Sequence, residues 1–482
     1  MDAMTEMGDI IRSGERISLS HYGLDTAQWQ AMLVSAGSTL PLLSCWADET
    51  RVYILLLERD RPLLASTPIE DRRYLAPSSR FAGADWGEKV AFDLWGVEAM
   101  NAQSDGYPAL DEGAWEETWP LSTTPNVGGS QPFPSPAGER LKPEESGLSG
   151  PLELSYHLLR GKAQTLTMKA GLAHRGVLSR AVGQSPEKAL SFISRMTAGG
   201  FVAHSLAFCR ALAQAQGREI SSDIRDAWMI LLEIERISVH LFDLARTARS
   251  VDAGLLATHC DHAREGIARV CYELLGSRRL TDIVTCDGVR EGVEIIPLAQ
   301  AVIAVLEPRL SALLELQSVF ASRLKGIAVL RPELATKFAI GGLVGRASGR
   351  HLDVRRREAG MRLEALRSTG SSQGDAAARD NLRVLEIRDS LTVLQRILGN
   401  FGTQDDEPVS RATDEGIGAA EGARGDIWYW LRLKDGKIRA LQARDPSVSV
   451  LSVLPNVLGG MAPEQLSVAL QSFALSPAGI AM

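Results

Sequence analysis

The sequence predicts a two-domain α+β protein, in which a small α/β domain precedes a larger, mainly helical domain with a small β hairpin near its end. Three observations support this division. The 482 residues exceed what one compact core usually organises. A stretch rich in Pro, Gly and Ser at residues 123–150 lacks apolar periodicity, and strand-like patterns precede it while long helical patterns follow it. We therefore expect domains at residues 15–122 and 151–482, joined by a linker at 123–150.

The first domain shows a helical pattern followed by two strands. Leu24–Val34 has helical spacing, and Thr39–Trp46 and Val52–Leu57 alternate as strands around a short polar turn. In the second domain the clearest helix runs from a Ser222 or Asp223 cap through Arg249. These patterns place a small sheet before the linker and long helices after it.

In the last third of the chain we expect regular elements separated by flexible segments. A helix is predicted at residues 381–398, between residues 368–380 and 402–426, which we expect to be flexible because they offer little apolar surface to bury. Beyond them, Asp435-Gly436 lies between two alternating strands and favours a type I′ turn. The sequence therefore predicts a hairpin at residues 427–444.

Composition and charge disfavour several classes of function. The net charge of -7 disfavours a nucleic-acid partner. The acidic N-terminus has no apolar segment, so it predicts neither a secretory signal nor a transit peptide, and we expect a cytoplasmic start. The apolar stretch Ile295–Leu306 is interrupted by Pro297 and Gln300 and is shorter than the roughly 20 residues that span a bilayer, so a core helix is expected. Any membrane association would then be peripheral.

The five cysteines do not form a metal-binding pattern. No two of them have C-x-x-C spacing, which argues against a disulfide scaffold and against a zinc or iron-sulfur site within the chain. His259, Cys260 and His262 lie close together, but adjacent residues on a helix point about 100° apart and cannot all converge on one ion. We expect this chain to bind no metal.

One glycine-rich segment contains and precedes charged residues. Gly345-Arg346-Ala347-Ser348-Gly349 is followed by Asp353 and Arg355, a combination that can form a tight loop with a charged wall. From the residues alone, a loop with solvated charges at the end of a helix is the favoured interpretation. The string resembles the G-x-R-A-S-G-x-x-x-D-x-R signature shared by the quinone-site subunit of respiratory complex I and the large subunits of membrane-bound, energy-converting nickel-iron hydrogenases.

Other segments resemble motifs of the same family. Gly171–Gly176, with His174 and Arg175, is similar to G-Y-x-H-R-G-x-E, although Leu172 and Leu178 replace its Tyr and Glu. Ser194–Phe208 resembles a segment that reads E-R-V-C-G-I-C followed by A-H-S. Glu233, Glu235, Arg236 and His240 match a helical E-x-E-R-x-x-x-H pattern of the family. Asp445 stands at the first position of a segment that resembles a second hydrogenase motif, D-P-C-x-x-C.

The first domain supports the same resemblance. Trp86–Val97 is similar to W-x-E-R-E-x-x-D-L-F-G-I, a hallmark of the complex I 30 kDa subunit, which is fused to the 49 kDa subunit in some enzymes. The resemblance therefore implies a 30 kDa-like domain joined to a 49 kDa-like or hydrogenase-large-subunit-like domain.

The ligands that would hold nickel and iron are missing from the matching positions. Such a centre needs four thiolates, because soft sulfur ligands suit these metals. Thr197 and Gly200 stand at the first cysteine pair, and Ser447 and Val450 at the second. Cys209 lies about twelve residues from Thr197, more than three helical turns away if the helix is continuous, so it is not expected to substitute.

The quinone-binding groups of complex I are also incomplete. In that branch a tyrosine at the position of Ala198 and a histidine in an N-terminal hairpin loop hydrogen-bond the quinone headgroup. Ala198 has no hydroxyl, and residues 150–157 look shortened where the loop would be, although Tyr156 and His157 lie nearby. The resemblance thus implies a pocket without either set of defining groups.

Polar side chains follow one stripe of the long predicted helix. Glu233, Arg236, His240 and Asp243 fall within about 80° of one another on a helical projection. The pattern alone favours a stripe that faces water, whereas the resemblance implies a stripe that supports the pocket. If His240 or His174 lies buried beside a carboxylate, it could relay protons.

The resemblance implies an oxidoreductase-complex subunit similar to those of NADH:quinone oxidoreductases and group 4 hydrogenases. Its nickel-free pocket would face the 4Fe-4S cluster of a small iron-sulfur subunit, accept quinone or another small carrier, and couple to ion translocation by membrane-arm subunits at the cytoplasmic face of the inner membrane. Two alternatives stay open: an active nickel-iron hydrogenase or formate hydrogenlyase large subunit, and a non-catalytic structural coupling subunit. The residues expected around the pocket are His174, Arg175, Arg195, Thr197, Ala198, Gly200, His204, Glu235, Arg236, His240, Arg346, Asp353, Arg355, Asp445 and Ser447.

Overall fold

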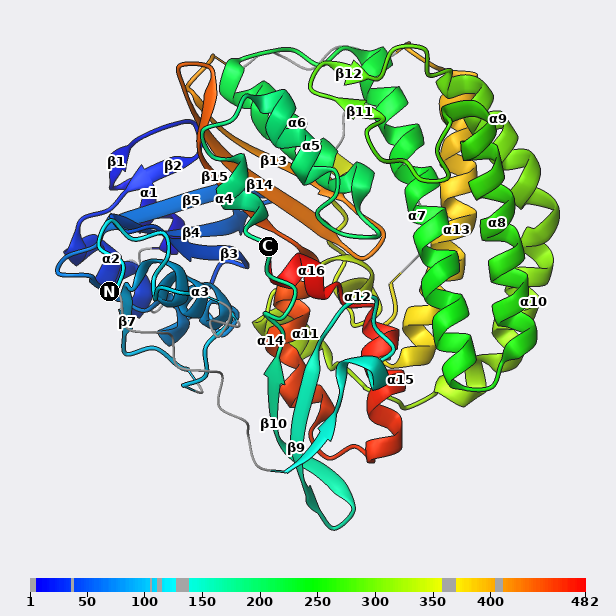
Figure 1. The fold of residues 1–482 in the computed structure, drawn as a ribbon, viewed down its shortest axis with the longest axis horizontal. Coiled ribbons are helices and arrows are strands. Elements are labelled where there is room, and N and C mark those ends of the chain that lie inside the picture. Colours follow the sequence, from blue (N-terminus) through cyan, green and yellow to red (C-terminus); the bar gives the residue numbers. More distant parts are fainter. Residues whose placement is uncertain are drawn as a thin grey trace.

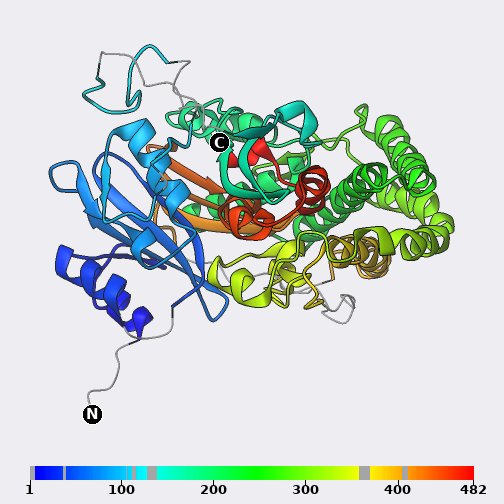
Figure 2. The same ribbon diagram turned by 90° about the horizontal axis from the view of Figure 1, so that it is seen from below.

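The computed structural model of the protein describes residues 6–35, 39–104, 106–110, 115–126, 138–357, 370–403 and 411–482. A sheet formed by the N-terminal residues lies at one end of the molecule and a layer of long helices at the other (Figure 1). Seen from below, the C-terminal strands lie between these two parts (Figure 2). Residues 127–137 of the predicted linker lie outside the described residues, and residues 139–141 form a strand, β8, that pairs with β9.

The N-terminal sheet has the order β1-β2-β5-β4-β3 and is buried on both faces. One face packs against helices α1–α3 through a core that includes Trp29, Met32 and Ile54. α2 begins at Thr26, where Asp25 and Gln28 form a capping box, two residues after the predicted start. The elements are α1 (Met7–Arg12), β1 (Glu15–Arg16), β2 (His21–Gly23), α2 (Thr26–Val34), β3 (Leu42–Ala47), β4 (Arg51–Glu58), β5 (Arg61–Pro68) and α3 (Asp85–Trp95), with a parallel pair β6 (Arg73–Leu75) and β7 (Glu98–Met100) beside them.

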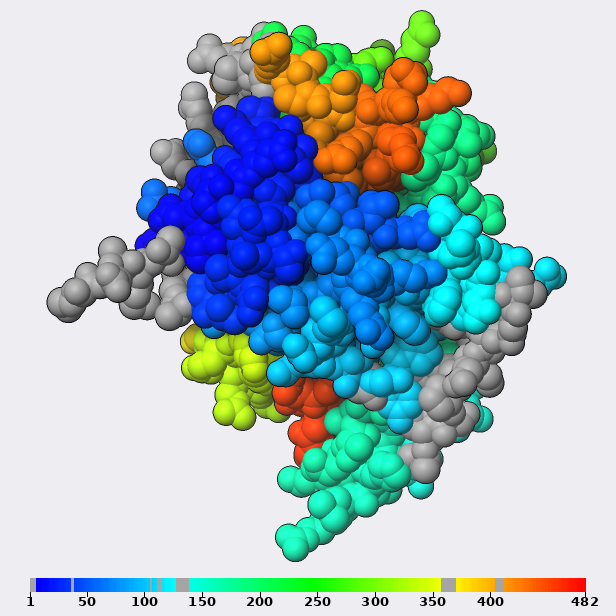
Figure 3. Space-filling view, turned by 90° about the vertical axis from the view of Figure 1, so that its left-hand side faces the viewer, coloured from blue at the N-terminus to red at the C-terminus, as the bar shows by residue number. Residues whose placement is uncertain are grey.

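The other face of this sheet packs against the C-terminal strands. Trp46 and Tyr53 stack at 5.2 Å between ring centroids, and Trp430 of β14 lies 5.4 Å and 5.2 Å from them. His21 of β2 is fully buried and its Nδ1 lies 2.9 Å from Glu415 Oε1 of β13. Figure 3 shows this side of the molecule, where the N-terminal residues lie directly beside the C-terminal strands. The N-terminal sheet is therefore anchored to residues some 400 positions later in the chain.

Long helices form the opposite end, with α7 at their centre. α7 (Ser222–Ser250) packs against α6, α8, α9, α13 and α15, and its bounds confirm the helix predicted from Ser222 or Asp223 through Arg249. The other helices are α4 (Val177–Ala181), α5 (Pro186–Ile193), α6 (Phe201–Gln216), α8 (Gly254–Leu275), α9 (Ile295–Leu306), α10 (Leu310–Phe320), α11 (Pro332–Lys337), α12 (Gly342–Arg346), α13 (Ala376–Gly399), α14 (Pro446–Leu458), α15 (Pro463–Phe473) and α16 (Pro477–Ile480).

The predicted C-terminal hairpin is confirmed, but it belongs to a three-stranded sheet. β14 (Asp426–Lys434) and β15 (Lys437–Arg444) meet at Asp435-Gly436, whose φ angles of 51° and 71° fit a type I′ turn. β13 (Glu415–Glu421) pairs with β14 on its other side. The prediction of a flexible segment at residues 402–426 is therefore wrong for β13 and its turn, while residues 404–410 lie outside the described residues.

Small residues explain why β13 was missed. It lies directly on α6, and a Cβ added to Gly416 or Gly418 would come within 1.9 Å of Ala211 O or 2.2 Å of Ala207 O. Glycine and alanine thus allow close packing here, although in a sequence the same residues suggest flexibility. The helix predicted at 381–398 likewise begins earlier, at Ala376, because Asp375 caps its first turn by accepting from the Ala378 amide at 2.8 Å.

A two-stranded hairpin projects from the body of the molecule (Figure 1). β9 (Glu153–Leu159) and β10 (Lys162–Lys169) meet at Arg160-Gly161, whose φ angles of 53° and 73° indicate a tight turn. Tyr156 is buried and His157 is exposed. The loop that the sequence suggested to be shortened is thus a hairpin with a two-residue turn.

One helical stretch has the length and composition to cross a membrane. Residues Ile295–Leu324 have a mean hydropathy of 1.4, and 28% of the apolar window is buried. The stretch comprises α9, a 3₁₀ turn at Glu307–Arg309, α10 and a second 3₁₀ turn at Ala321–Leu324. The buried side of α9 packs against α7, α8 and α13. Among the described residues no other helix meets this length and hydropathy criterion.

We expect Gly418→Ala to lower the melting temperature, because the new Cβ would lie 2.2 Å from Ala207 O and 2.3 Å from Ala211 N. Overpacking of this kind destabilises by about 1–3 kcal/mol. Thermal unfolding followed by circular dichroism measures the effect. Gly399→Ala is the matched control, since its Cβ would meet no atom within 4 Å. Equal melting temperatures for both variants would contradict close packing of β13 on α6.

Candidate functional site

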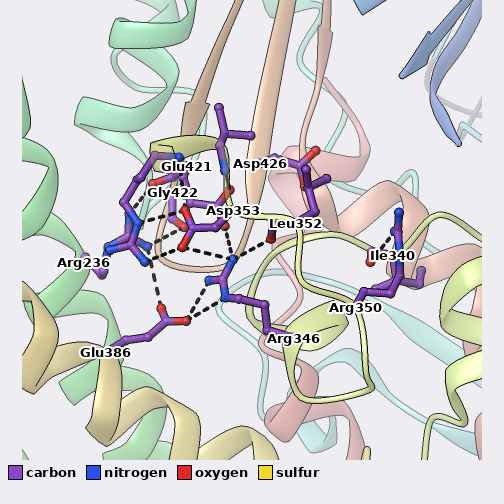
Figure 4. A network of polar contacts seen from close by, with 12 residues as sticks. Arg236, Ile340, Arg346, Arg350, Leu352, Asp353, Glu386, Glu421, Gly422 and Asp426 are labelled. Atoms are coloured by element: carbon purple, nitrogen blue, oxygen red, sulfur yellow. Dashed lines mark hydrogen bonds and ion pairs between the residues drawn. The ribbon is translucent and has the colours of Figure 1, made fainter. Parts of the chain in front are cut away.

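Buried charged side chains from α7, α12, α13, β13 and residues 353–355 meet at one place in the interior (Figure 4). Each side chain is at most 6% exposed, so the groups depend on one another rather than on water for their stabilisation. We call this set the core charge network; its members are Glu233, Arg236, His240, Arg346, Asp353, Arg355, Glu386 and Glu421.

Arg346 holds the network together. Its Nη2 lies 2.7 Å from Glu386 Oε1, and its Nη1 lies 2.7 Å from Glu421 Oε1. The backbone around it requires glycine: Gly342 has a φ of 60°, and a Cβ there would lie 2.2 Å from Gly425 Cα. The close approach of Gly342 to Gly425 therefore brings Arg346 against the turn that follows β13. The charges of the glycine-rich string are buried, not solvated as the residues alone suggested.

Glu233 is the second centre of the network. Arg236 Nε lies 3.1 Å from Glu233 Oε2, Arg355 Nη1 lies 3.3 Å from Glu233 Oε1, and the Ser390 hydroxyl donates to Glu233 at 2.5 Å. Burial raises the pKa of Glu233, but Arg236 and Arg355 outweigh it and the net shift is downward. Asp353, which accepts from Arg355 Nη2 at 2.7 Å, also has a lowered pKa because Arg355 and Arg346 outweigh its burial.

His240 is held in the network by one side of its ring. Its Nε2 lies 3.0 Å from Glu386 Oε2, whereas its Nδ1 has no hydrogen-bond partner among the described residues. Burial lowers the pKa of His240, and the opposing effect of Glu386 does not overcome it. The imidazole is therefore neutral at pH 7. The stripe on α7 is buried rather than exposed to water.

The two segments that resemble nickel-binding motifs also meet. His204 of α6 lies 3.3 Å from Asp445 Oδ2 through Nε2, and 3.0 Å from the Tyr429 hydroxyl through Nδ1. Asp445 caps α14 by accepting from the Ser447 amide at 2.8 Å. The fold therefore brings the segment that contains His204 against the segment that contains Asp445.

These positions do not fit a nickel-iron centre. Gly200 approaches His204 and Thr197 so closely that a Cβ there would lie 2.7 Å from Thr197 Oγ1 and 2.9 Å from His204 Cδ2. The Ser447 hydroxyl already accepts from the Ser476 amide at 3.0 Å. Cys209 is fully buried on α6 and its thiol donates to Thr285 O at 3.5 Å. Within the described ranges, no group of three or more His, Cys, Asp or Glu side chains could hold a metal ion.

A pocket of about 560 Å³ borders this region. Ala198 and Gly199 line it, as do Glu235 and Val239 of α7 and Arg424 from the turn after β13. Glu235 accepts from the Val202 and Ala203 amides at 2.8 Å and 3.0 Å, and burial raises its pKa. Glu235 and Arg236 are neighbours in the chain, so α7 contributes to the pocket and to the core charge network at once.

Arg175, Arg195 and His174 lie outside the core charge network, the pocket and the His204–Asp445 contact. Arg195 forms an exposed pair with Asp282. Arg175 donates to Met196 O at 2.7 Å, and His174 Nδ1 lies 3.3 Å from Ala481 O. His174 and Arg175 thus tie residues 171–176 to the backbone at Ala481 and Met196.

Sequence reasoning missed residues that complete the site. Glu386 lies on the predicted helix at 381–398, where nothing in the sequence marked it, and Glu421 lies in the segment expected to be flexible. Arg424 pairs with Asp243 at 2.9 Å, which leaves Asp243 with a pKa of about 2 because Arg424 and Arg246 outweigh its burial. Buried carboxyls on a helix without a motif give no local signal, since only the tertiary partner reveals them.

Comparison with known proteins gives the same relationship as the motifs. Residues 255–414 match the family described as respiratory-chain NADH dehydrogenase, 49 Kd subunit, which confirms the family resemblance. The chain is 26% identical over 312 residues to the C/D subunit of NADH-quinone oxidoreductase from Phocaeicola vulgatus, covering 62% of this chain and 60% of that protein. It is 24% identical over 426 residues to formate hydrogenlyase subunit 5 of Escherichia coli, covering 80% of this chain and 73% of that protein.

A solved structure shares the fold. The membrane-bound sulfane sulfur reductase, an archaeal respiratory membrane complex, contains a chain that matches 72% of this protein with a TM-score of 0.63 and 18% identity. The match covers 98% of that chain. The present chain thus spans about three fifths of the length of the Phocaeicola vulgatus protein and nearly all of the structural neighbour's.

We expect Arg346→Ala to destabilise the chain by about 3–5 kcal/mol, because it leaves Glu386 and Glu421 buried without their shared cation. Urea denaturation followed by tryptophan fluorescence measures the change. Arg195→Ala is the control, because its ion pair with Asp282 is exposed and contributes less than about 1 kcal/mol. A loss in Arg346→Ala no larger than that of the control would contradict the central role of Arg346.

Proposed function

We propose that this chain is the large, nickel-free subunit of a membrane-associated redox complex of the complex I or hydrogenase-related type. It contributes a pocket that faces an iron-sulfur cluster of a partner subunit. One observation carries the proposal. The buried ion pairs of this region are present, whereas none of the four positions that would supply a thiolate has a cysteine. The chain itself binds no cluster.

The composition of the pocket supports a ligand with both apolar and polar parts, because apolar and charged side chains line it together. Val239 and Phe242 of α7 supply apolar surface, and Ser238 and Glu235 supply polar groups. Small-molecule pockets usually combine an apolar lining with a few polar groups that fix orientation. A quinone or another small carrier fits this chemistry, although Ala198 lacks the hydroxyl found in the quinone branch.

The side of the pocket that faces outward supports a partner. Arg278 and Arg279 follow the end of α8 and line the pocket, and Arg279 is exposed. A small iron-sulfur subunit docked here would bring its cluster to the loop at Ala198 and Gly199. Membrane-arm subunits would then couple the redox step to ion translocation, with this chain held peripherally at the cytoplasmic face of the inner membrane.

A second function is that of a non-catalytic subunit that only transmits conformational change. This structural role is favoured by close packing at the positions that correspond to the nickel-ligand cysteines. Gly200 lies against His204 there, and the Ser447 hydroxyl accepts from the Ser476 amide. The pocket volume of about 560 Å³ favours the first function, since a purely structural subunit has no need to retain it.

We expect the tagged chain, purified from its native membranes, to contain no stoichiometric nickel and to copurify with a small subunit that bears a tetranuclear cluster. Metal analysis, partner identification by mass spectrometry and low-temperature paramagnetic resonance test this together. Stoichiometric nickel would favour the active hydrogenase and overturn our interpretation of Thr197, Gly200, Ser447 and Val450. A copurifying small subunit without cluster cysteines would favour the structural role.

We further propose that His240 relays protons in this complex, because it is neutral, fully buried and bonded to Glu386. We expect His240→Ala to leave partner copurification intact and to lower turnover with a changed pH profile. His259→Ala is the control, since His259 lies on α8 and its Nε2 bonds to the Arg309 carbonyl, at 3.1 Å. Unchanged assembly and unchanged turnover in His240→Ala would remove the relay.

A further inference from the structure

The core charge network contains one carboxyl group more than it has guanidinium groups. Its ion pairs lie within 4.0 Å and its members are shielded from water. An unbalanced charge in such surroundings is strongly disfavoured unless a proton neutralises it. The carboxyl groups are those of Glu233, Asp353, Glu386 and Glu421, and the guanidinium groups are those of Arg236, Arg346 and Arg355.

His240 is poorly suited to hold that proton at rest, as distinct from passing one on transiently. A protonated imidazole donates through both nitrogens, and Nδ1 of His240 is buried without a hydrogen-bond partner in the described part of the chain. A neutral ring that donates from Nε2 to Glu386 leaves only an acceptor unpaired. The extra proton therefore belongs on a carboxyl group.

Glu421 is the carboxyl group of the network that pairs with one arginine alone, and its Oε2 accepts from the Val354 amide at 3.0 Å. It shares Arg346 with Glu386, and both contacts are 2.7 Å long. Its direct cross-strand partner in the β13–β14 register is Asp426, which is also fully buried. Like charges at opposed positions of a sheet destabilise it. Asp426 Oδ1 has no hydrogen-bond partner among the described residues, so this carboxylate can accept one more hydrogen bond.

The other charged groups near Glu421 do not balance it. Arg444 Nη1 lies 2.8 Å from Asp426 Oδ2, so Arg444 forms its ion pair with Asp426 and not with Glu421. Arg350 donates to Ile340 O at 2.6 Å and makes no ion pair within 4.0 Å to a described carboxylate. On α6, Arg210 donates to Ala419 O at 2.8 Å. Arg236 donates to the backbone carbonyls of Glu421 and Gly422, not to the Glu421 carboxyl group.

We propose that Glu421 is a proton-binding site, which holds one exchangeable proton inside the folded chain and so lets the core charge network exist in a neutral and a singly charged form. The inference concerns this chain alone and stands apart from the redox function proposed above. Burial raises the pKa of Glu421 to about 7, with Arg346 opposing the rise and Asp353 and Asp426 adding to it. Glu386 has the same guanidinium partner, yet Arg346 and His240 outweigh its burial and its pKa is well below the ordinary value.

The sign of the stability effect follows from the raised pKa. An exposed glutamate in the unfolded chain has a pKa of about 4.3, so the folded chain binds more protons than the unfolded chain up to about pH 7. The stabilisation from this proton is complete below the unfolded pKa and is lost as the pH rises through the folded pKa. In that window the unfolding constant rises by up to about tenfold per pH unit.

The test compares Glu421→Gln with Glu386→Gln in the full chain. Glutamine imitates a protonated carboxyl group, so we expect Glu421→Gln to melt near the wild-type temperature at about pH 6 and to lose less on going to about pH 8. Glu386→Gln, a matched change at the same arginine, should melt lower at both pH values. Calorimetry in buffers of different ionisation enthalpy should show that the wild type releases about one proton more than Glu421→Gln when it unfolds at about pH 6.

Equal proton release by the wild type and Glu421→Gln would overturn the proposal, as would a melting temperature for Glu421→Gln as low as that of Glu386→Gln. Infrared difference spectra between the wild type and Glu421→Gln provide a second test, because burial also raises the pKa of Glu88 to about 7 and that of Asp380 to about 6, and both would contribute to the wild-type band. In the difference we expect a carbonyl stretch of a buried protonated carboxyl group that persists at about pH 6 and is lost by about pH 8. Absence of that band at the lower pH would also overturn the proposal.

Discussion

The way the long helices meet the C-terminal sheet depends on one buried guanidinium group. Arg346 is 5% exposed and makes ion pairs with carboxylates from α13 and β13, two elements that lie far apart in the chain. A buried cation must be surrounded by acceptors, so its position dictates where those elements can lie. Glu386 in turn binds His240 of α7, which extends the same requirement to the central helix. Charge balance, together with apolar packing, therefore specifies how these elements meet.

Sequence patterns predicted the regular elements well and the contacts poorly. The long helix α7, the strands β3 and β4 and the Asp435-Gly436 turn follow from periodicity and turn chemistry, which are local properties. β13 was not predicted, since its glycines suit close contact with α6 and carry no strand signal.

For the candidate site too, the sequence identified some of the residues and missed their partners. Family resemblance identified Arg236, His240, Arg346, Asp353 and Arg355, which the structure brings into one network. Their partners Glu386 and Glu421 belong to no motif, and nothing in the sequence marks which glutamate of a helix or strand is buried. The partner of a buried charge is a property of the tertiary structure, and a single sequence does not encode it locally.

Contact between the N-terminal sheet and the C-terminal strands has a consequence for how the two parts associate. Trp46, Tyr53 and Trp430 pack together, and His21 meets Glu415, within one continuous chain. Two surfaces joined by a peptide chain meet at an effective concentration that can reach the millimolar range. The N-terminal sheet and the C-terminal strands can therefore stay in contact even if their affinity for each other is modest. The two parts are also produced in equal number, so neither is left with an exposed aromatic face that could aggregate.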